Sequence, residues 1–273
     1  MSIELKDKVV IITGASSGIG LACAEEFAKQ GSNLILGARK FVSLCEIARD
    51  LEQKYGIRAI AVSCDVSQEE SCKELIHQAL ITFKRLDILV NNAGISMRGL
   101  FEKTDISVLK QVMDVNFWGT VYCCKYALPY LLQSKGSIIG VSSIAGYTGL
   151  PGRSGYSASK FAMQGFLEVV RLENFKKGVH VLVACPGFTA SNIRKVALDP
   201  TGAEKGESNM DENKMMSPEE VARKIVSGII KRKRTLVMTR EGKLTVLLSK
   251  IFPSLLERMV YSRFSKEKDP ILK

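Results

Sequence analysis

Short runs of β-branched and aliphatic residues alternate with amphipathic helical patterns through the first 185 residues of the chain. The runs are expected to form strands, at residues 9–12, 34–36, 59–62, 86–90, 137–141 and 179–183. Helical patterns follow the first two of them, over residues 18–30 and 42–55, with apolar side chains at helical spacing. The strand runs lack strict polar alternation, which is typical of a parallel sheet that helices cover on both faces. This alternation restricts the fold to the α/β class.

The length of the chain favours one structural unit. At 273 residues it is near the size at which a single α/β domain stays undivided. We therefore expect a doubly wound Rossmann-type parallel sheet over residues 1–240, with an amphipathic helical extension over residues 241–273. Ligands of such folds bind at the carboxyl ends of the strands. Residues 189–217 are polar and aperiodic, so we expect a mobile loop or lid there, followed by a helix start at Ser217-Pro218.

A glycine-rich turn follows the first predicted strand and opens the first predicted helix. Its sequence is Thr13-Gly14-Ala15-Ser16-Ser17-Gly18-Ile19-Gly20. Glycine lets the backbone turn sharply and approach a diphosphate, and the helix N-terminus supplies free N–H groups and partial positive charge. Any tight strand-to-helix turn favours glycine, so it is the position of this turn that favours nucleotide binding. No Gly-Lys-Ser/Thr follows, which excludes a Walker loop.

The end of the second predicted strand is where a dinucleotide-binding fold distinguishes NAD from NADP. Arg39 and Lys40 stand there, and a carboxylate that would bind both ribose hydroxyls is missing. Two cations at this place suit the 2′-phosphate of NADP(H). The alternative is a solvent-exposed basic turn without a ligand.

Tyr156 and Lys160 open a long helical pattern and lie four residues apart. This spacing places them on one helix face, with their Cβ atoms about 6 Å apart. A free tyrosine has a pKa of about 10, and a neighbouring ammonium lowers that pKa by stabilising the phenolate. Lys160 would thereby make Tyr156 a usable general acid/base. Tyr-x-x-x-Lys alone is usually an ordinary helix face, so the hydroxyl of Ser143, at the end of a predicted strand, is the second signal.

Taken together, these motifs resemble the short-chain dehydrogenase/reductase family over nearly the whole chain. Asn91-Asn92-Ala93-Gly94 is similar to the family's segment after the fourth strand, and Pro186-Gly187 to its turn beside the nicotinamide. The chain matches the family's catalytic tetrad in order and spacing with Asn116, Ser143, Tyr156 and Lys160.

The resemblance also implies a role for each member of the tetrad. Tyr156 would donate the proton to the carbonyl oxygen during reduction, while Ser143 holds the same oxygen. Lys160 would also bind the nicotinamide ribose, and Asn116 would hold a water in a proton relay to Lys160. The cofactor would deliver the hydride.

The same resemblance implies an NADP(H) site drawn from segments across the chain. Its expected members are Gly14, Ser16, Ser17, Gly18, Ile19, Gly20, Arg39, Lys40, Asp65, Val66, Asn92, Ala93, Gly94, Tyr156, Lys160, Pro186, Gly187, Thr189 and Ser191. Asp65-Val66 is similar to the pair that contacts the adenine ring. The family often has Thr where Ser191 stands, and the retained hydroxyl predicts a modest effect. Thr189 replaces a usual Val or Ile, so its backbone is the expected contact.

The expected function is an NADP(H)-dependent oxidoreductase that transfers a hydride between nicotinamide and a carbonyl or secondary alcohol. Residues 38–39, 142–146 and 156–162 resemble the 11β-hydroxysteroid dehydrogenase branch, which is mostly NADP-linked and often membrane-associated. This implies a lipophilic substrate without identifying it, and the physiological direction stays open. The pocket is expected to include Ser96, Met97, Tyr147, Leu150 and the loop after Thr189, although Tyr147 and Leu150 fit the core equally well.

Two other classes of function compete with this one. A non-catalytic NADP(H)-binding regulator on the same fold is the alternative, but it has no need of Tyr156. A nucleic-acid binder would explain the net charge of +11, of which residues 217–273 contribute +8 from 14 Lys/Arg and 6 Asp/Glu. No binding motif or interleaved aromatic residues accompany that charge, so we expect no nucleic-acid partner.

The C-terminal extension carries two apolar helix faces separated by Pro253. Leu244, Leu247, Leu248 and Ile251 form the first, and Leu255, Leu256, Met259 and Val260 begin the second. They could pack on the domain or on a partner subunit, since a homodimer or homotetramer is expected. The sharper hypothesis is a helix pair over residues 243–268 at an anionic membrane surface.

The cysteine pattern and the ends of the sequence predict a cellular compartment. Seven cysteines without a Cys-x-x-Cys or Cys/His ligand pattern favour a reducing compartment and no structural metal. Residues 1–8 lack a basic leader before an apolar run, and no uncharged stretch is typical of a membrane span. We expect a cytoplasmic protein, with peripheral membrane contact as the open alternative.

Overall fold

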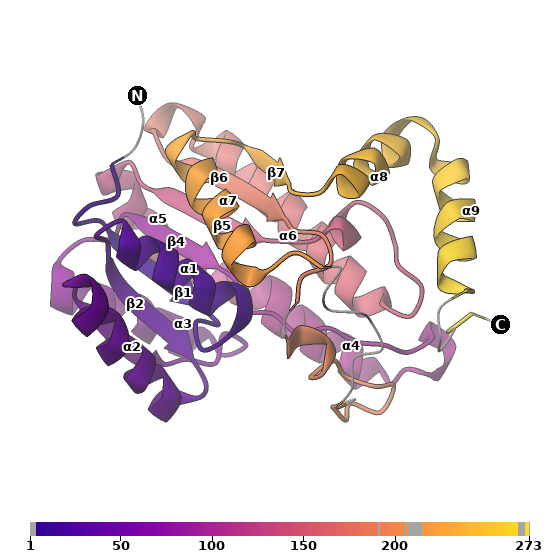
Figure 1. Cartoon of the computed structure of the whole chain (residues 1–273), viewed down its shortest axis with the longest axis horizontal. Helices are drawn as coiled ribbons and strands as arrows, with labels where there is room; N and C mark the ends of the chain where they lie inside the picture. The colour runs from indigo at the N-terminus through magenta and orange to yellow at the C-terminus, as the bar shows by residue number, and fades with distance from the viewer. Residues whose placement is uncertain (1–3, 191, 205, 207–214, 267–270, 273) are drawn as a thin grey trace.

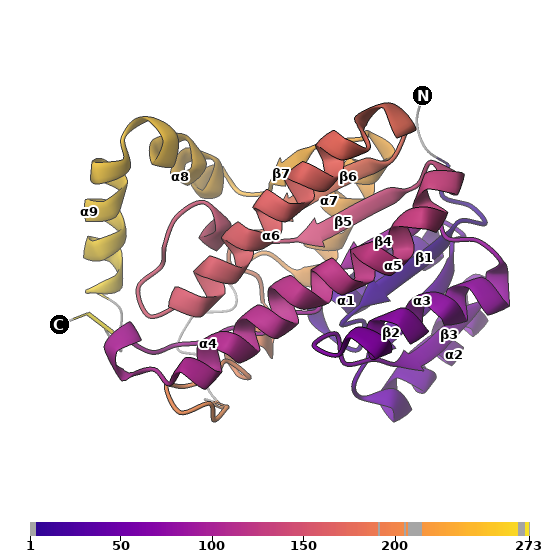
Figure 2. The same cartoon turned by 180° about the vertical axis from the view of Figure 1, so that it is seen from behind.

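The structure, a computed structural model, describes residues 4–190, 192–204, 206, 215–266 and 271–272. Its strands alternate with helices in chain order, as Figures 1 and 2 show. The strands are β1 (Val9–Thr13), β2 (Asn33–Ala38), β3 (Ala59–Ser63), β4 (Ile88–Asn91), β5 (Ser137–Val141), β6 (His180–Cys185) and β7 (Thr235–Val237). The principal helices are α1 (Gly18–Lys29), α2 (Phe41–Tyr55), α3 (Glu69–Phe83), α4 (Ile106–Met113), α5 (Gly119–Ser134), α6 (Ser154–Glu173), α7 (Pro218–Ile230), α8 (Arg240–Ile251) and α9 (Pro253–Phe264).

The seven strands form one parallel sheet in the order β3-β2-β1-β4-β5-β6-β7. The predicted doubly wound sheet is therefore confirmed. From β1 the chain first builds outward to β3 and then returns to place β4 on the other side of β1. At such a reversal the connections leave β1 and β4 in opposite directions, and a crevice opens at the carboxyl ends of these two strands.

Helices cover both faces of the sheet because successive strand residues point to opposite sides. In β1, Val10 and Ile12 pack with α1, α2 and α7, whereas Val9 and Ile11 pack with α3, α5 and α6. All four of these side chains are buried. Both faces are thus apolar, which explains why the strand sequences lack polar alternation.

The last two helices stand apart from the two layers and lie beyond the carboxyl ends of the strands (Figure 1). Thr239 caps α8 by accepting a hydrogen bond from the Gly242 N–H at 2.9 Å. Pro253 occupies the first turn of α9, which confirms the predicted break between two helices. Beyond α9 the chain returns to the body of the protein, where Ile271 packs against Gly152. None of the helices in the described part of the chain is long and apolar enough to cross a bilayer.

Candidate active site

A cavity of about 920 Å³ opens at the carboxyl end of the sheet, where the strand order reverses. Most of the residues that the sequence assigned to the site line this cavity. They are Gly14, Ser16, Ser17, Gly18, Ile19, Arg39, Lys40, Asp65, Val66, Asn92, Ala93, Gly94, Ser143, Tyr156, Lys160, Pro186, Gly187 and Thr189. Ser191 lies outside the described residues.

Gly14 and Gly20 of the glycine-rich turn are required for two different reasons. Gly14 has a positive φ of 66°, and a Cβ there would lie 2.9 Å from the Cα of Ala93. Gly20 does not line the cavity, and a Cβ on it would collide with the carbonyl oxygen of Gly14. Gly14 therefore lets the backbone face the cavity, whereas Gly20 lets α1 approach the turn.

Hydrogen bonds tie the turn after β1 to the segment after β4. The Thr13 hydroxyl accepts from the backbone N–H groups of Asn92 and Ala93, each at 3.0 Å. The Asn92 side-chain amide donates back to the carbonyl oxygens of Thr13 and Gly14, at 2.9 and 3.2 Å. Two segments that are nearly 80 residues apart in sequence thus form one rigid floor.

The N-terminus of α1 faces this floor and has the properties of an anion site. Ser17 caps the helix, and its side chain makes no capping hydrogen bond. The first-turn N–H groups and the helix dipole favour a negative group at this end. The residues fit the diphosphate of a dinucleotide, with Arg39 and Lys40 exposed at the end of β2 for a further phosphate.

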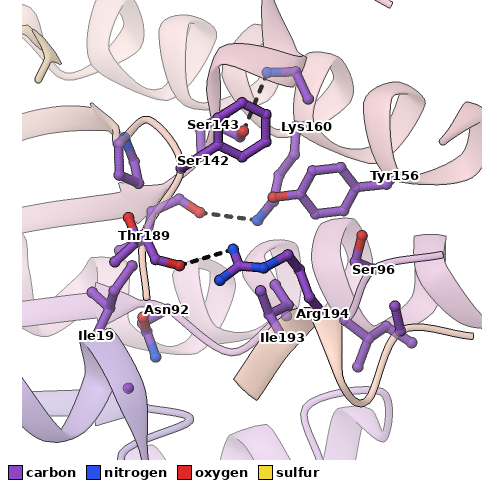
Figure 3. A pocket seen from close by; sticks show the side chains of 18 of the residues that line it. Ile19, Asn92, Ser96, Ser142, Ser143, Tyr156, Lys160, Thr189, Ile193 and Arg194 are labelled. Carbon is purple, nitrogen blue, oxygen red and sulfur yellow. Dashed lines mark hydrogen bonds between the residues drawn. The ribbon is translucent and has the colours of Figure 1, made fainter. Parts of the chain in front are cut away.

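Ser143, Tyr156 and Lys160 point into the same part of the cavity (Figure 3). Ser143 follows β5, and its Oγ accepts a hydrogen bond from the Ala145 N–H at 3.2 Å. Tyr156 and Lys160 come from the first turns of α6, and the Lys160 Nζ lies 5.7 Å from the centre of the Tyr156 ring. The Lys160 ammonium also donates to the Val141 carbonyl oxygen at 2.9 Å. The end of β5 and the start of α6 are therefore joined at the cavity wall.

Burial controls how Tyr156 and Lys160 ionise. It raises the pKa of Tyr156 above its ordinary value, although a hydrogen bond from Ser143 and the charge of Arg153 oppose the rise. It lowers the pKa of Lys160 to about 8. The structure thus differs from the expectation that Lys160 lowers the pKa of Tyr156, because loss of solvent outweighs the charges that favour the phenolate.

Asn116, the fourth member of the predicted tetrad, lies behind the cavity wall and is fully buried. It belongs to a π-helical turn, Asp114–Trp118, between α4 and α5. Its Oδ1 accepts from the Ile95 N–H at 2.8 Å, and its Nδ2 donates to the Ile95 carbonyl and the Ser159 hydroxyl. Its side chain thus fixes the strand-to-helix segment that passes behind Lys160, and its role in a water relay stays a prediction.

The turn after β6 supplies the opposite wall. Gly187 is required by space, because a Cβ on it would lie 2.8 Å from the Thr239 side chain. Thr189 donates its hydroxyl to the Gly187 carbonyl, and its own carbonyl accepts from Arg194 at 2.9 Å. The 3₁₀ turn Asn192–Arg194 follows, so part of the predicted loop has local structure.

The loop after Thr189 lines the cavity as expected, whereas the contribution of α9 was not found by sequence reasoning. Arg194 reaches the space in front of Tyr156 and Lys160 (Figure 3). From α9, Arg263 lines the cavity, pairs with Glu241 of α8 and lies with its guanidinium 5.3 Å from the Phe188 ring centre. Ser96, Met97 and Leu150 line the cavity as expected, but Tyr147 does not and packs against the apolar layer below it. No periodic pattern or motif in the sequence marks these long-range contacts.

Comparison with known proteins finds similarity over most of the chain. Residues 8–201 match the family described as short chain dehydrogenase. The chain is 36% identical to an 11-beta-hydroxysteroid dehydrogenase 1A of Arabidopsis thaliana, covering 94% of this chain and 76% of that protein. It is 34% identical to dehydrogenase/reductase SDR family member 7B of Danio rerio, covering 97% and 88%.

Two solved structures are similar in fold. One is an alcohol dehydrogenase from Thermococcus sibiricus complexed with 5-hydroxy-NADP, with a TM-score of 0.76, 26% identity and coverage of 85% of this chain and 96% of that one. The other is a short chain dehydrogenase/reductase from Burkholderia phymatum in complex with NAD, with a TM-score of 0.83, 24% identity and coverage of 93% and 96%.

Proposed function

The chain belongs to the short-chain dehydrogenase/reductase family of oxidoreductases, and from this premise we propose that it uses NADP(H) to interconvert a carbonyl and a secondary alcohol. Tyr156 is the general acid/base of this proposal. The observation that carries it is the meeting of Ser143, Tyr156 and Lys160 in one cavity with a nucleotide-binding turn. A regulator that only binds the cofactor has no use for such a group of proton donors.

NADP(H), when bound, supplies or accepts the hydride. Gly14, the N-terminus of α1 and the Asn92-Ala93 segment would hold its diphosphate and nicotinamide half. Arg39 and Lys40 would hold the 2′-phosphate, and the lack of a carboxylate over residues 37–40 supports the preference for NADP(H) over NAD(H). One of the similar structures contains an NADP derivative and the other contains NAD. The proposed preference for NADP(H) therefore rests on Arg39 and Lys40 alone.

In the direction of reduction, Tyr156 would act as the acid. Its raised pKa keeps the phenol protonated at neutral pH, which is the form that can protonate a carbonyl oxygen. The Ser143 hydroxyl, which already reaches the Tyr156 oxygen, would hold the same substrate oxygen. Lys160, with a pKa of about 8, could then return a proton to Tyr156 near neutral pH, and Asn116 would position a water on this path.

A lipophilic substrate is supported by the side of the cavity away from the nucleotide turn. Apolar side chains line this side, namely Met97, Leu150, Ile193, Val196, Val260 and Phe264, with Arg194 and Arg263 beside them. Val260 and Phe264 come from α9, so the C-terminal extension over residues 241–273 would form part of the substrate site. The names of the relatives from Arabidopsis thaliana, which denote steroid dehydrogenases, agree with a lipophilic substrate class.

We also propose that the outer faces of α8 and α9 make a peripheral contact with an anionic membrane surface. Large apolar side chains are exposed there, namely Leu244, Leu247, Ile251, Phe252, Leu255 and Met259. Lys243, Lys250 and Arg258 are exposed beside them. Apolar groups in the lipid boundary with cations at the head groups are typical of interfacial helices.

A homodimer or homotetramer is supported by a second group of exposed apolar side chains. These lie on or beside α5 and α6, which cover one face of the sheet (Figure 2). Exposed side chains on or beside these helices include Trp118, Phe161, Val169, Leu172 and Phe175. We propose that a second copy of the chain covers this surface, because patches of this kind mark protein contacts.

Substitution of Tyr156 by Phe tests the proposed chemistry. The Tyr156→Phe protein should keep its fold and its affinity for NADPH, while turnover falls by at least ~10²-fold, since a positioned acid/base supplies about that much. Turnover is read as loss of NADPH absorbance with a panel of lipophilic ketones and aldehydes. Tyr55→Phe, at the end of α2 and outside the cavity, is the matched control. If the Tyr156→Phe protein turned over at nearly the wild-type rate, the mechanism would be overturned. If the wild-type protein bound NADPH but reduced no carbonyl, the alternative of a non-catalytic NADP(H)-binding regulator would be favoured.

A further inference from the structure

Gln164 lies on α6 one turn beyond Lys160 and two turns beyond Tyr156. Residues spaced by four share one face of a helix, so all three side chains are directed toward the end of β5. We propose that Gln164 is a positioning residue of the active site, which acts through Ser143 and does not touch the substrate or the cofactor. This inference rests on the proposed function of Ser143 and Tyr156.

The Gln164 amide is surrounded by acceptors from the ends of two neighbouring strands. Its Nε2 donates to the Ser142 Oγ at 2.9 Å, the shortest of its contacts. The Ser143 carbonyl oxygen lies 3.5 Å from the same nitrogen, and the Cys185 Sγ at the end of β6 lies 3.9 Å from it. One side chain thus links the segment that carries Ser143 to both α6 and β6.

The space for this amide is provided by Gly146. It lies in the 3₁₀ turn Ile144–Gly146, which follows Ser143, and any Cβ there would collide with the Gln164 Nε2. The turn therefore closes over the amide and leaves it little freedom to move. Side chains held in this way fix the groups that they bind.

Three successive residues at the end of β5, Val141 to Ser143, are consequently anchored to one helix. Lys160 holds the Val141 carbonyl at 2.9 Å, and Gln164 holds the Ser142 hydroxyl and contacts the Ser143 carbonyl. The Ser143 hydroxyl is left to face Tyr156 and the cavity, with the Ala145 N–H fixing its orientation. Gln164 itself does not line the cavity. Its loss should displace Ser143 while leaving the nucleotide turn on the other side unchanged.

The expected effect is a loss of turnover without a loss of cofactor affinity. A displacement of 1 Å at a reacting group costs about a hundredfold in rate, and a smaller shift of Ser143 should cost about tenfold. The hydrogen bond between Ser143 and Tyr156 should weaken as well. Because that bond lowers the pKa of Tyr156, its weakening should raise this pKa further.

Gln164→Met tests the proposal, because methionine keeps the volume of glutamine and removes the amide donors. Gln133→Met, on an exposed site near the end of α5, is the matched control. Three measurements are made on each protein: kcat for a lipophilic carbonyl, the Kd of NADPH by fluorescence, and the pKa of Tyr156. The pKa of Tyr156 is measured by following the ultraviolet absorbance of ionised phenol as the pH rises. The titration of the same protein with Tyr156→Phe is subtracted, so that only Tyr156 contributes.

For Gln164→Met we expect kcat to fall about tenfold, the Kd of NADPH to stay within about twofold, and the pKa of Tyr156 to rise. The control should change none of the three. An unchanged pKa of Tyr156 would overturn the proposal, as would a parallel loss of NADPH affinity, which indicates general disruption. The phenol titration needs no turnover, so it tests the role of Gln164 independently of the proposed function. The proposed function itself would be refuted if the wild-type protein reduced no carbonyl.

Discussion

At the scale of single residues, the exclusion of water changes Tyr156 and Lys160 in opposite directions. Burial disfavours whichever form is charged, so the pKa of the phenol rises while that of the ammonium falls to about 8. The positions of both residues could be predicted from their spacing in the sequence. Their pKa values could not, because burial, the largest cause of both shifts, arises only in the folded chain.

In the proposed function, Arg39 is the residue on which the preference for NADP(H) would depend most. Charge-assisted hydrogen bonds to a 2′-phosphate contribute about 1.5–3 kcal/mol, so wild type should bind NADPH roughly tenfold to a hundredfold more tightly than NADH. Arg39→Ala should lose most of this difference by weakening NADPH alone. The Kd of each cofactor, measured by fluorescence titration, gives the comparison, with Arg49→Ala on the exposed side of α2 as control. Equal affinities of the wild-type protein for both cofactors would show that this assignment is wrong.

At the scale of elements, the sequence located regular structure well and long-range contacts poorly. The predicted strands and the helix over residues 42–55 agree with the observed ones to within one or two residues at most ends. The π-helical turn that holds Asn116 interrupts a continuous helical pattern, so periodicity alone could not reveal it. The contact of Arg263 with Phe188 could not be foreseen either, because it joins segments about 75 residues apart with no shared motif.

The pair α8–α9 makes the membrane proposal testable. Leu247 and Ile251 are 53% and 56% exposed on the outside of α8, away from the cavity. The Leu247→Glu/Ile251→Glu protein should lose sedimentation with anionic phosphatidylserine-containing vesicles, whereas wild type should sediment with them at low salt and less at high salt. Ile81→Glu, at an exposed position of α3, is the control. A chain truncated after Thr239 should not bind either. If wild type itself fails to sediment at low salt, the membrane proposal is wrong and a protein partner is favoured.

At the scale of the whole molecule, burial of a charged group in the candidate active site lowers the stability of the fold. Lys160 is 3% exposed, and its pKa falls from an ordinary 10.5 to about 8. The unfolded chain therefore binds more protons than the folded chain between these pH values, and stability rises with pH through this window. Below pH 8 the full penalty of a buried ammonium is present, about 3 kcal/mol for a shift of this size.

Lys160→Met should consequently stabilise the protein while abolishing its activity. Loss of the hydrogen bond to the Val141 carbonyl offsets about 1 kcal/mol, so the free energy of unfolding at pH 7 should increase by about 2 kcal/mol. The gain should shrink as the pH rises from 8 to 10.5, because the wild-type ammonium loses its proton on the way. Urea unfolding of both proteins at pH 7 and pH 10 measures this difference, with the exposed Lys125→Met as control. A Lys160→Met protein less stable than wild type at pH 7 would contradict the argument.

Because α9 forms part of the cavity wall, the two sides of the cavity are completed at different times during synthesis of the chain. The described residues that face the expected cofactor are all present once the chain has grown to Thr189. The wall on the other side is completed only by Val260, Arg263 and Phe264 of α9, more than 70 residues later in the chain. Under the proposed function, a chain cut before α9 by a protease would retain the nucleotide site and lose part of the substrate site. Under the proposed function it would hold reducing equivalents that it could not pass on, so productive turnover would require a chain that extends through α9.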